Sequence, residues 1–379
     1  MWSGQTVGME ERILTEKVKN RIVVFAAAVF FLGAFIWCLL KPAVPFSESE
    51  RRSLKTMPSF SVSGFVSGKF MKDFESCSMD QFPMRDSFRT LKSVVALYLL
   101  GQKDTGGIYL AEGYASKLEY PMNTASLDNA ASRFRHIYEK YLKDRNVKLY
   151  LSIIPDKNSV LAGEKGYPAM DYQAFARYLK EKTDYMQYID IYDCLELADY
   201  YKTDTHWRQE KILDVARRLA EGMGISLSEE YMVQTLKTPF YGVYYGQSAL
   251  PLAPDEICYL ESGIFDQCRV FDYETNEEIP VYDMEKAEGR DPYEMFLAGP
   301  KSLLRVQNES ADTDRRLIIF RDSFGSSIAP LLFEGYSEIL LIDIRYLSSE
   351  LLGNYVEFDN ADVLFLYSTL VLNNSETLK

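Results

Sequence analysis

Short apolar runs of strand length alternate with stretches of helical periodicity along the later part of the chain. The strand-like runs are 147–155, 186–194, 315–320, 338–344 and 361–368. The stretches with apolar residues at helical spacing are 127–145, 171–183, 207–223, 328–335 and 349–355. Apolar strands separated by helices are typical of a parallel sheet covered by helices on both faces. The pattern therefore predicts an α/β domain over residues 101–379.

Two regions depart from this alternation. Residues 236–300 contain the segments "PFYGVYYGQS", "EICYLES" and "EIPVYDM", which predict an antiparallel or irregular β-rich insertion. Residues 41–100 combine a polar stalk of weak periodicity with an amphipathic helix at 87–100. The segment "GGIYLAEGYASK" then predicts two short strands around a turn.

The most apolar run lies near the N-terminus. Residues 22–40, "IVVFAAAVFFLGAFIWCLL", carry no charged side chain. A helix of this length covers roughly 28 Å, about one hydrocarbon core. Basic residues precede the run, so we expect a cytoplasmic tail at 1–21, a single-pass transmembrane anchor at 22–40 and an extracytoplasmic remainder. These basic residues are Arg12, Lys17, Lys19 and Arg21. A cleaved signal peptide is the alternative, which the length of the run and the lack of a small-residue cleavage site after it disfavour.

The chain is acidic, with a formal net charge of −13. Nucleic acid binding requires Lys and Arg gathered on one face, and no Lys/Arg-rich block offsets this charge. We therefore expect no nucleic acid partner.

Most of the cysteines would lie outside the cytoplasm, where thiols can oxidise. They are Cys77, Cys194, Cys258 and Cys268. Cys258 and Cys268 flank "YLESGIFDQ", a plausible hairpin, and form the most favourable pair for a disulfide. Reduced, partly buried thiols are an equally open alternative, because connectivity does not follow from sequence alone.

One of the two histidines lies beside an acid, in the segment "TDTHW". On extended chain, residues two apart point the same way, so Asp204 can accept a hydrogen bond from His206 and fix its tautomer. The free ring nitrogen can then take a proton from a hydroxyl. A capped helix start and a pair of metal ligands are the alternatives, but no HxxxH or CxxC spacing supplies further ligands, and we expect no metal. The other histidine, His136, lies on a helix among charged residues and is expected to be solvated.

A serine follows the strand-like run 315–320, in the segment "RDSFGSS". A strand that turns sharply into a helix can hold the Ser323 hydroxyl at the helix N-terminus, where the amides of Ser323 and Gly325 can bind an oxyanion. Open α/β sheets place their sites beyond the carboxyl ends of the strands, which favours this interpretation. The alternative is a helix cap, since Ser and Asp are both favoured there.

These segments, in this order, resemble a known group of proteins. "TDTHW" followed by "RDSFGSS" is similar to the alginate O-acetyltransferase-like group of SGNH hydrolase-like proteins. The blocks "ESERRSLKTMPSFS", "GIYLAEGYASK", "IIPDKNSVL", "DTHWRQEKILDVARRL", "PFYGVYYGQSALPLAPDEI" and "LLIDIRYL" resemble the DHHW proteins of Gram-positive bacteria more closely still. The resemblance implies an SGNH-like α/β fold and a catalytic triad of Ser323, His206 and Asp204.

The chain departs from the family pattern at three places. Thr205 stands where the DHHW name has its second residue, a histidine, and Arg321 stands where a Gly-Asp-Ser block has glycine. Ala298-Gly299-Pro300 stands where many relatives have Gly-Gly-Asn, which leaves the second oxyanion donor open among Gly299, Asn158 and Asn308.

Three further residues are candidates for substrate contacts. Lys157 follows a strand-like run and could bind an anionic substrate, or be a surface lysine. Tyr245 and its neighbouring tyrosines could stack on sugar rings, or pack on the core. Arg345, in "DIRY", could bind a substrate carboxylate, although a structural ion pair with a nearby aspartate is the favoured interpretation.

The resemblance implies an O-acetyltransferase that modifies an extracellular or cell-wall polysaccharide through an acetyl-enzyme at Ser323. No cofactor is expected. A single span cannot carry acetyl groups across a bilayer, so a multi-span membrane acyltransferase is the expected acetyl donor. A carbohydrate acetyl esterase would use the same triad, and a non-catalytic glycan-binding scaffold is a further alternative.

Overall fold

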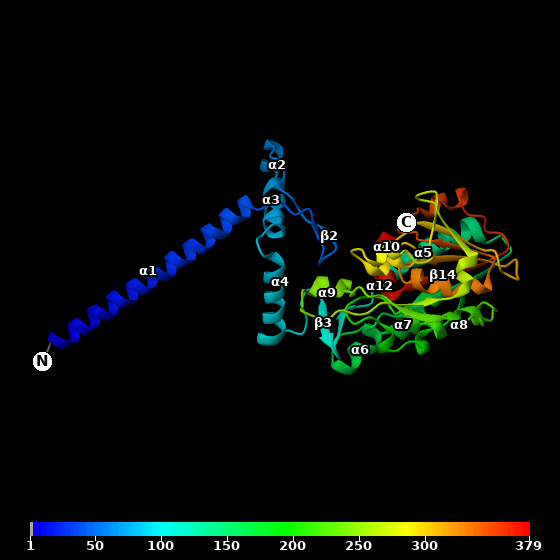
Figure 1. Ribbon diagram of the computed structural model, residues 1–379, viewed down its shortest axis with the longest axis horizontal. Coiled ribbons are helices and arrows are strands. Elements are labelled where there is room, and N and C mark those ends of the chain that lie inside the picture. Colours follow the sequence, from blue (N-terminus) through cyan, green and yellow to red (C-terminus); the bar gives the residue numbers. More distant parts are fainter. Residues whose placement is uncertain (1–2) are drawn as a thin grey trace. The chain divides into compact units, whose positions relative to one another are not determined.

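The computed structural model describes the backbone of residues 3–379 and the side chains of residues 16–379 except 39, 164 and 165. Arg12, one of the basic residues expected to orient the membrane span, therefore lies outside the residues whose side chains are described. The chain separates into two compact units, residues 1–92 and 93–379 (Figure 1). The finer division into tail, anchor, stalk and catalytic domain stays a prediction.

The first unit begins with one long apolar helix. The stretch Glu16–Cys38 is long and apolar enough to cross a membrane, a property that signal sequences share. The expected stalk is more regular than its sequence suggests, because Gln81 uses both ends of its amide to hold the backbone of Val44, at 2.8 and 2.9 Å. The elements of this part are α1 Ser3–Leu40, β1 Phe46–Ser47, β2 Arg52–Ser53, α2 Val62–Val66, α3 Lys69–Asp80 and α4 Arg85–Val94, which continues as a π-helical turn at Val95–Leu99.

The second unit is built, within the described residues, around an eight-stranded sheet with the strand order β10-β9-β11-β13-β12-β14-β5-β6. Strands β13, β12, β14, β5 and β6 are parallel to one another, while β11, β9 and β10 extend the sheet through antiparallel pairs. These strands are β5 Val147–Ile154, β6 Gln187–Tyr188, β9 Cys268–Asp272, β10 Glu277–Ile279, β11 Leu303–Asn308, β12 Arg316–Arg321, β13 Glu338–Ile342 and β14 Ala361–Ser368. Two separate hairpins pair β3 Ile108–Ala111 with β4 Tyr114–Lys117, and β7 Met232–Thr235 with β8 Cys258–Glu261.

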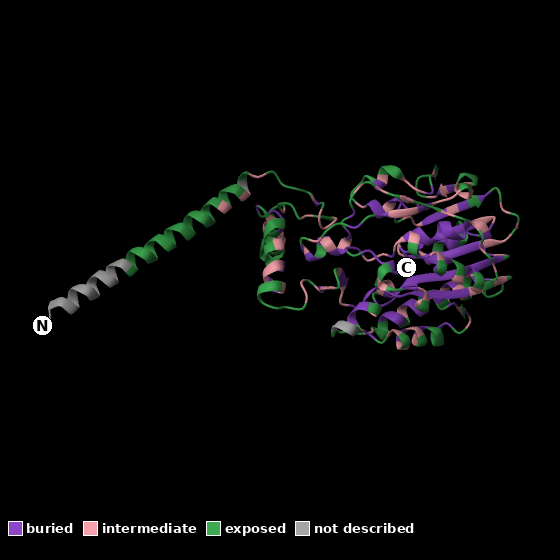
Figure 2. Ribbon diagram, turned by 60° about the horizontal axis from the view of Figure 1, so that its bottom comes forward, coloured by how far each residue is buried: buried purple, intermediate pink, exposed green. Residues whose placement is uncertain are grey.

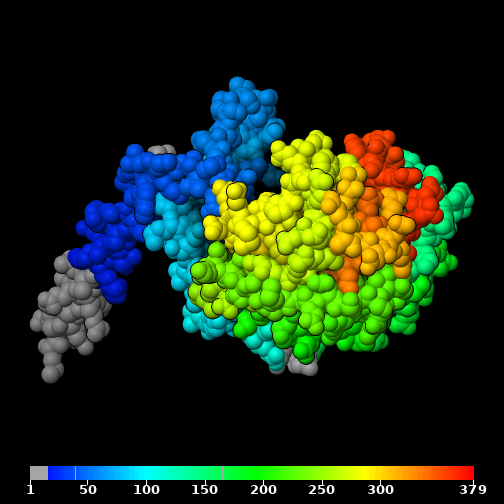
Figure 3. Space-filling view, turned by 45° about the vertical axis from the view of Figure 1, so that its right-hand side comes forward, coloured from blue at the N-terminus to red at the C-terminus, as the bar shows by residue number. Residues whose placement is uncertain are grey.

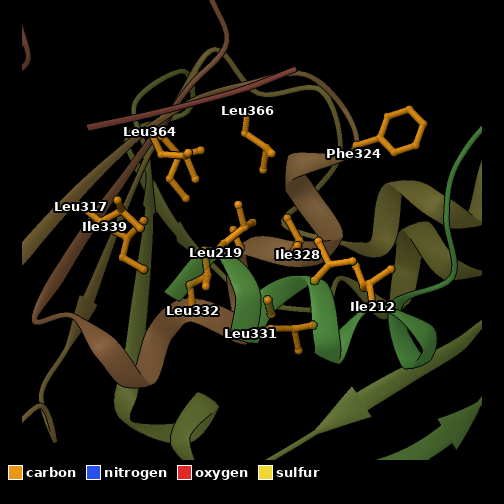
Figure 4. Packing of buried hydrophobic residues seen from close by; sticks show 14 of the residues in the cluster. Ile212, Leu219, Leu317, Phe324, Ile328, Leu331, Leu332, Ile339, Leu364 and Leu366 are labelled. Atoms are coloured by element: carbon orange, nitrogen blue, oxygen red, sulfur yellow. The ribbon is translucent and has the colours of Figure 1, made fainter. Parts of the chain in front are cut away.

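Helices cover both faces of this sheet, as the alternating pattern predicts. The strands of the sheet are largely buried (Figure 2). Successive residues of β14 point to opposite faces, so Leu364 and Leu366 join one apolar cluster (Figure 4), while Phe365 and Tyr367 join the other. The first cluster is closed by α8 and the second by α5 and α7. The helices of this unit are α5 Thr124–Ile137, α6 Asn158–Lys165, α7 Tyr172–Lys182, α8 Leu213–Gly222, α9 Val243–Ser248, α10 Met284–Ala287, α11 Gly325–Ile328 and α12 Thr369–Leu372.

The helix expected at 207–223 begins later, at Leu213. Trp207 instead forms a β-bridge with Tyr200, and a 3₁₀ turn follows at Gln209–Lys211. The buried amide of Gln209 donates to Ser327 O at 2.8 Å and accepts from Leu260 N at 2.9 Å. These tertiary hydrogen bonds override a helical periodicity that the sequence shows plainly.

The region 236–300 holds strands, as expected, but does not form a separate β module. The segment "PFYGVYYGQS" contains the short helix α9, and β9 and β10 join the main sheet at its edge. In Figure 3 this region, lime to yellow, forms a broad part of the surface of the second unit.

The expected disulfide between Cys258 and Cys268 is absent from the structure, in which the five described cysteines are free thiols. The hairpin that would align the pair does not form. Cys258 opens β8 in a small hairpin with β7, whereas Cys268 opens β9 in the main sheet. Burial raises the pKa of the Cys268 thiol to about 12, which keeps it protonated and unreactive.

We predict that Leu364→Ala lowers the free energy of unfolding by about 3 kcal/mol, because it leaves a cavity in the middle of the first apolar cluster. Leu364 is fully buried in β14, between β12 and β5. Urea unfolding of the detergent-solubilised chain measures the change. Val233→Ala, at a position that is 59% exposed, is the control and should change the stability by less than about 0.5 kcal/mol.

Candidate active site

At the carboxyl end of β12, a serine meets an aspartate and a histidine that lie more than a hundred residues earlier in the chain. His206 Nε2 lies 2.8 Å from Ser323 Oγ, and His206 Nδ1 lies 2.6 Å from Asp204 Oδ1. Ser323 follows β12, and the histidine and the aspartate lie on the loop between residues 200 and 207. The three groups form one continuous line of hydrogen bonds from a carboxylate to a hydroxyl.

The loop that carries Asp204 and His206 is a short hairpin-like excursion rather than a helix start. Tyr201 N donates to His206 O at 3.1 Å, so the chain leaves and returns side by side. Trp207, which is fully buried, anchors the return by donating from Nε1 to Ser327 Oγ at 2.8 Å. Residues 202–206 form bends, so the Asp-x-His contact is made on a turn and not on the extended chain that was expected, and the helix expected directly after it begins only at Leu213.

The Asp204 carboxylate is almost completely buried, with 1% of the residue exposed. Its Oδ1 also accepts from His206 N at 3.0 Å, and its Oδ2 accepts from Val243 N at 2.7 Å. Because an ionised carboxylate can only accept a hydrogen bond, His206 Nδ1 carries the proton that it donates to Asp204 Oδ1. Nε2 then faces the serine hydroxyl as an acceptor. Nε2 is thus the nitrogen that can take the Ser323 proton.

Aromatic rings hold the imidazole in this orientation. The Tyr293 ring stacks on His206 with centroids 3.9 Å apart and an angle of 12° between the planes, and Phe324 packs against it at 4.8 Å. The Tyr293 hydroxyl lies 2.8 Å from Ser327 Oγ, the same oxygen that Trp207 reaches. Tyr293 was not predicted, since a lone tyrosine in the 236–300 region carries no sequence signal that links it to the histidine.

The turn that presents Ser323 is held by the carboxylate before it. Asp322 Oδ1 accepts from Phe324 N at 3.0 Å, and Oδ2 accepts from Ser368 N at 2.8 Å at the end of β14. Gly325 N donates to Asp322 O at 3.1 Å, so this amide closes the turn rather than pointing freely at an oxyanion. A Cβ at Gly325 would lie 2.6 Å from Arg321 Cβ, so the glycine lets the buried arginine pack beneath the turn.

The expected alternatives for a second oxyanion donor are engaged in other hydrogen bonds. The amide of Gly299, in a turn with φ of +79°, donates to Phe296 O at 3.1 Å. Asn158 is fully buried and accepts from the Tyr109 hydroxyl at 2.8 Å. Asn308 donates to Phe333 O at 3.0 Å, beside the amino end of β13 and therefore at the opposite edge of the sheet from Ser323.

Lys157 does not face solvent, where an anionic substrate would bind. It is 1% exposed, and its ammonium donates to backbone carbonyls of the Asp204 loop. Arg345 makes a two-pronged ion pair with the buried Asp343, with Nη2 to Oδ2 at 2.6 Å, which agrees with the structural interpretation. Tyr245 is half-buried, and its ring lies 4.6 Å from that of Tyr241, which is 41% exposed.

The second histidine lies apart from this site. His136 is on α5, and its side chain is 40% exposed beside Glu350. Among the described residues, no group of three or more His, Cys, Asp or Glu side chains is arranged to hold a metal ion.

Comparison with known proteins shows likeness at the level of structure. Neither a protein-family model nor a curated protein sequence matches the chain. A crystal structure of a DHHW family protein from Eubacterium siraeum is 21% identical, with a TM-score of 0.58, covering 73% of this chain and 95% of that one. The structure of PatB1 from Bacillus cereus is 17% identical, with a TM-score of 0.57, covering 72% and 98%. A second PatB1 structure, which carries a sulfonyl adduct, is 17% identical, with a TM-score of 0.55, covering 70% and 95%.

At these identities the likeness shows a common fold. The chain shares the α/β fold of a DHHW family protein, and the expected parallel sheet with helices on both faces is confirmed.

We predict that phenylmethanesulfonyl fluoride sulfonylates Ser323, because His206 can remove the hydroxyl proton as the oxygen attacks sulfur. Mass spectrometry of peptides from the treated full-length chain locates the adduct. His206→Ala should slow labelling by more than about 10³-fold, since the base is lost. His136→Ala is the matched control and should label at the wild-type rate. Equal labelling of His206→Ala and wild type would contradict the assignment.

Proposed function

We propose that the chain is an O-acetyltransferase that acts on an extracellular or cell-wall polysaccharide. The observation that carries the proposal is the hydrogen-bonded line from Asp204 through His206 to Ser323, with separations of 2.6 and 2.8 Å. A buried carboxylate, an imidazole in a fixed tautomer and a half-exposed serine are the parts that acyl transfer requires. The ordered motifs that resemble the DHHW and alginate O-acetyltransferase-like proteins support polysaccharide as the acceptor.

In the first half of the proposed reaction, Ser323 Oγ attacks the carbonyl carbon of an acetyl donor. His206 Nε2 takes the hydroxyl proton, and the Asp204 carboxylate stabilises the resulting imidazolium. Collapse of the tetrahedral intermediate breaks the bond between the acetyl carbon and the leaving group, which receives the proton from His206. The product is an acetyl ester on Ser323.

In the second half, a sugar hydroxyl replaces the departed donor. His206 takes its proton while the sugar oxygen attacks the acetyl carbon, and the proton then returns to Ser323 Oγ as the ester bond to serine breaks. Water in place of the sugar would give a carbohydrate acetyl esterase with the same residues. The resemblance to alginate O-acetyltransferase-like proteins favours transfer to sugar over hydrolysis, and the acceptor experiment below distinguishes the transferase from the esterase.

The proposed place of action is the outer face of the cell membrane. The apolar helix α1 serves as a single-pass anchor in this proposal, and the basic residues before the span orient it with the second unit outside. One helix provides no path for an acetyl group across the bilayer, so a multi-span membrane acyltransferase supplies the donor. No metal or cofactor takes part in the proposed steps.

We predict that the full-length chain takes acetyl from an aryl acetate, with release of the phenol measured by absorbance. Ser323→Ala should abolish the reaction, and His206→Ala should nearly do so. Asp204→Asn should slow it by roughly 10⁴-fold, because the amide favours the wrong imidazole tautomer. His136→Ala is again the control and should release the phenol at the wild-type rate.

Acetyl transfer to sugar is tested by adding polysaccharide acceptors to the same assay and measuring ester-linked acetate on the polymer. A transferase diverts acetyl from water to the polymer. Hydrolysis that is unchanged by every acceptor would support the esterase instead. If wild type and Ser323→Ala are equally inactive while glycan binding persists, the catalytic proposal is wrong and a glycan-binding scaffold replaces it.

A further inference from the structure

A buried ammonium lies directly beneath the loop that carries the aspartate and the histidine. Lys157 is 1% exposed, and its Nζ donates to Tyr201 O and to Asp204 O, each at 2.6 Å. A third carbonyl, that of Lys202, lies at 3.4 Å. The ammonium of this lysine therefore faces the backbone carbonyls of one four-residue segment, 201–204.

A buried carboxylate holds the same segment by its other backbone groups. Asp255, 9% exposed, accepts from Lys202 N at 2.8 Å and from Thr203 N at 2.7 Å. The Thr203 hydroxyl adds a third bond to Asp255 Oδ2 at 2.6 Å. The carbonyls of the loop thus meet a cation and its amides meet an anion, which restricts the loop from both sides.

We propose that Lys157 is a positioning residue of the Asp204–His206–Ser323 system, whose ammonium fixes the Asp204 backbone and thereby aims its carboxylate at the histidine. The inference rests on the proposed function, because aim matters only if His206 acts as a base. Asp204 has its carbonyl on Lys157 and its carboxylate on Val243 N and His206. Both ends of the residue are therefore held, and release of the carbonyl end frees the carboxylate to drift from the imidazole.

If Lys157 has this role, the reactivity of Ser323 should depend on whether Lys157 is protonated. Burial lowers the pKa of the Lys157 ammonium to about 7, against the opposing effect of the carboxylates of Asp204, Asp255 and Asp156. The rings of Tyr114 and Tyr244 also face it, at 5.8 and 5.0 Å. Above neutral pH the group becomes a neutral amine, which has fewer donors and weaker hydrogen bonds to carbonyls.

Folding stability and serine reactivity should therefore move in opposite directions with pH. An unfolded lysine keeps its proton up to about pH 10.4, so between about pH 7 and 10 the unfolded chain binds a proton that the folded chain does not. This group accordingly adds stability as pH rises, while the same loss of the proton loosens the loop. A purely structural role would not produce a reactivity that falls while stability grows.

The test measures the rate of Ser323 modification by phenylmethanesulfonyl fluoride from pH 6 to 10 on the full-length chain. The wild-type rate should decline by about tenfold from its maximum as Lys157 loses its proton. Lys157→Met should be about 100-fold slower at pH 7, the usual cost of a catalytic group displaced by about 1 Å, and should lack the alkaline decline. Lys103→Met is the matched control, since Lys103 is an exposed lysine whose Nζ also donates to a carbonyl, that of Gly166 at 3.5 Å, and it should behave as wild type.

A second readout does not depend on catalysis. The proton on His206 Nδ1, in its 2.6 Å hydrogen bond to Asp204, should give a low-field ¹H NMR signal, and His136→Ala removes the other histidine from the spectrum. Lys157→Met in that background should shift or abolish the signal at pH 6.5. An unchanged signal together with an unchanged Ser323 rate would overturn the positioning role and leave the proposed function standing. If Ser323 is unreactive in the wild type, the proposed function is overturned, while the ¹H NMR signal of His206 still tests whether Lys157 positions Asp204.

Lys157→Arg keeps the experiment decisive if Lys157→Met does not fold. Arginine stays charged throughout the range, so the variant should retain reactivity at pH 9 relative to pH 7. A Lys157→Met variant that folds and labels Ser323 at the wild-type rate at pH 7, or a Lys157→Arg variant that folds and loses reactivity from pH 7 to pH 9 as the wild type does, would reject the proposal.

Discussion

The buried carboxylate of Asp204 imposes the strictest demand on this molecule. A charge withdrawn from water must have its lone pairs occupied by donors, or the cost of burying it is not recovered. The amide and ring of His206 and the amide of Val243 are among the donors that meet that demand. The first two belong to one residue of the same loop, but the Val243 amide comes from the 236–300 region. The aspartate can therefore be buried only if that region is folded against it.

The 236–300 region, which interrupts the alternation of strands and helices in the sequence, thus completes the site. Val243 reaches the carboxylate, Tyr293 stacks on the imidazole and Asp255 holds the loop amides. The approach is so close that a Cβ at Gly242 would lie 2.3 Å from Asp204 Cβ. Glycine is the residue that lets the backbone before α9 come this near to the loop. The Asp204–His206–Ser323 line therefore depends on contacts from the 236–300 region as well as on the strands of the main sheet.

Sequence reasoning succeeded where a local pattern carries the information. The continuous apolar runs of β12 and β14 mark strands buried on both faces. The contact between Asp204 and His206 was also expected, although it is made on a bend and not on extended chain. It failed where distant contacts decide. Gln209 is drawn out of a helix by partners across the fold, and nothing near Lys157 in the chain marks its ammonium for burial under a loop. The same limit applies to Cys258 and Cys268, whose separation depends on which sheet each strand joins.

The position of β14 also fixes when the reactive serine can exist. This strand is the last of the sheet in chain order, yet it lies between β12 and β5, and its Ser368 amide holds the Asp322 carboxylate that shapes the serine turn. Such long-range pairing forms late and slowly in folding. A partly folded chain in which β12 has formed but β14 has not joined it lacks the Ser368 amide that holds Asp322, so the turn at Ser323 is not yet shaped. Docking of the final strand is therefore the step that completes the geometry of the Asp204–His206–Ser323 line.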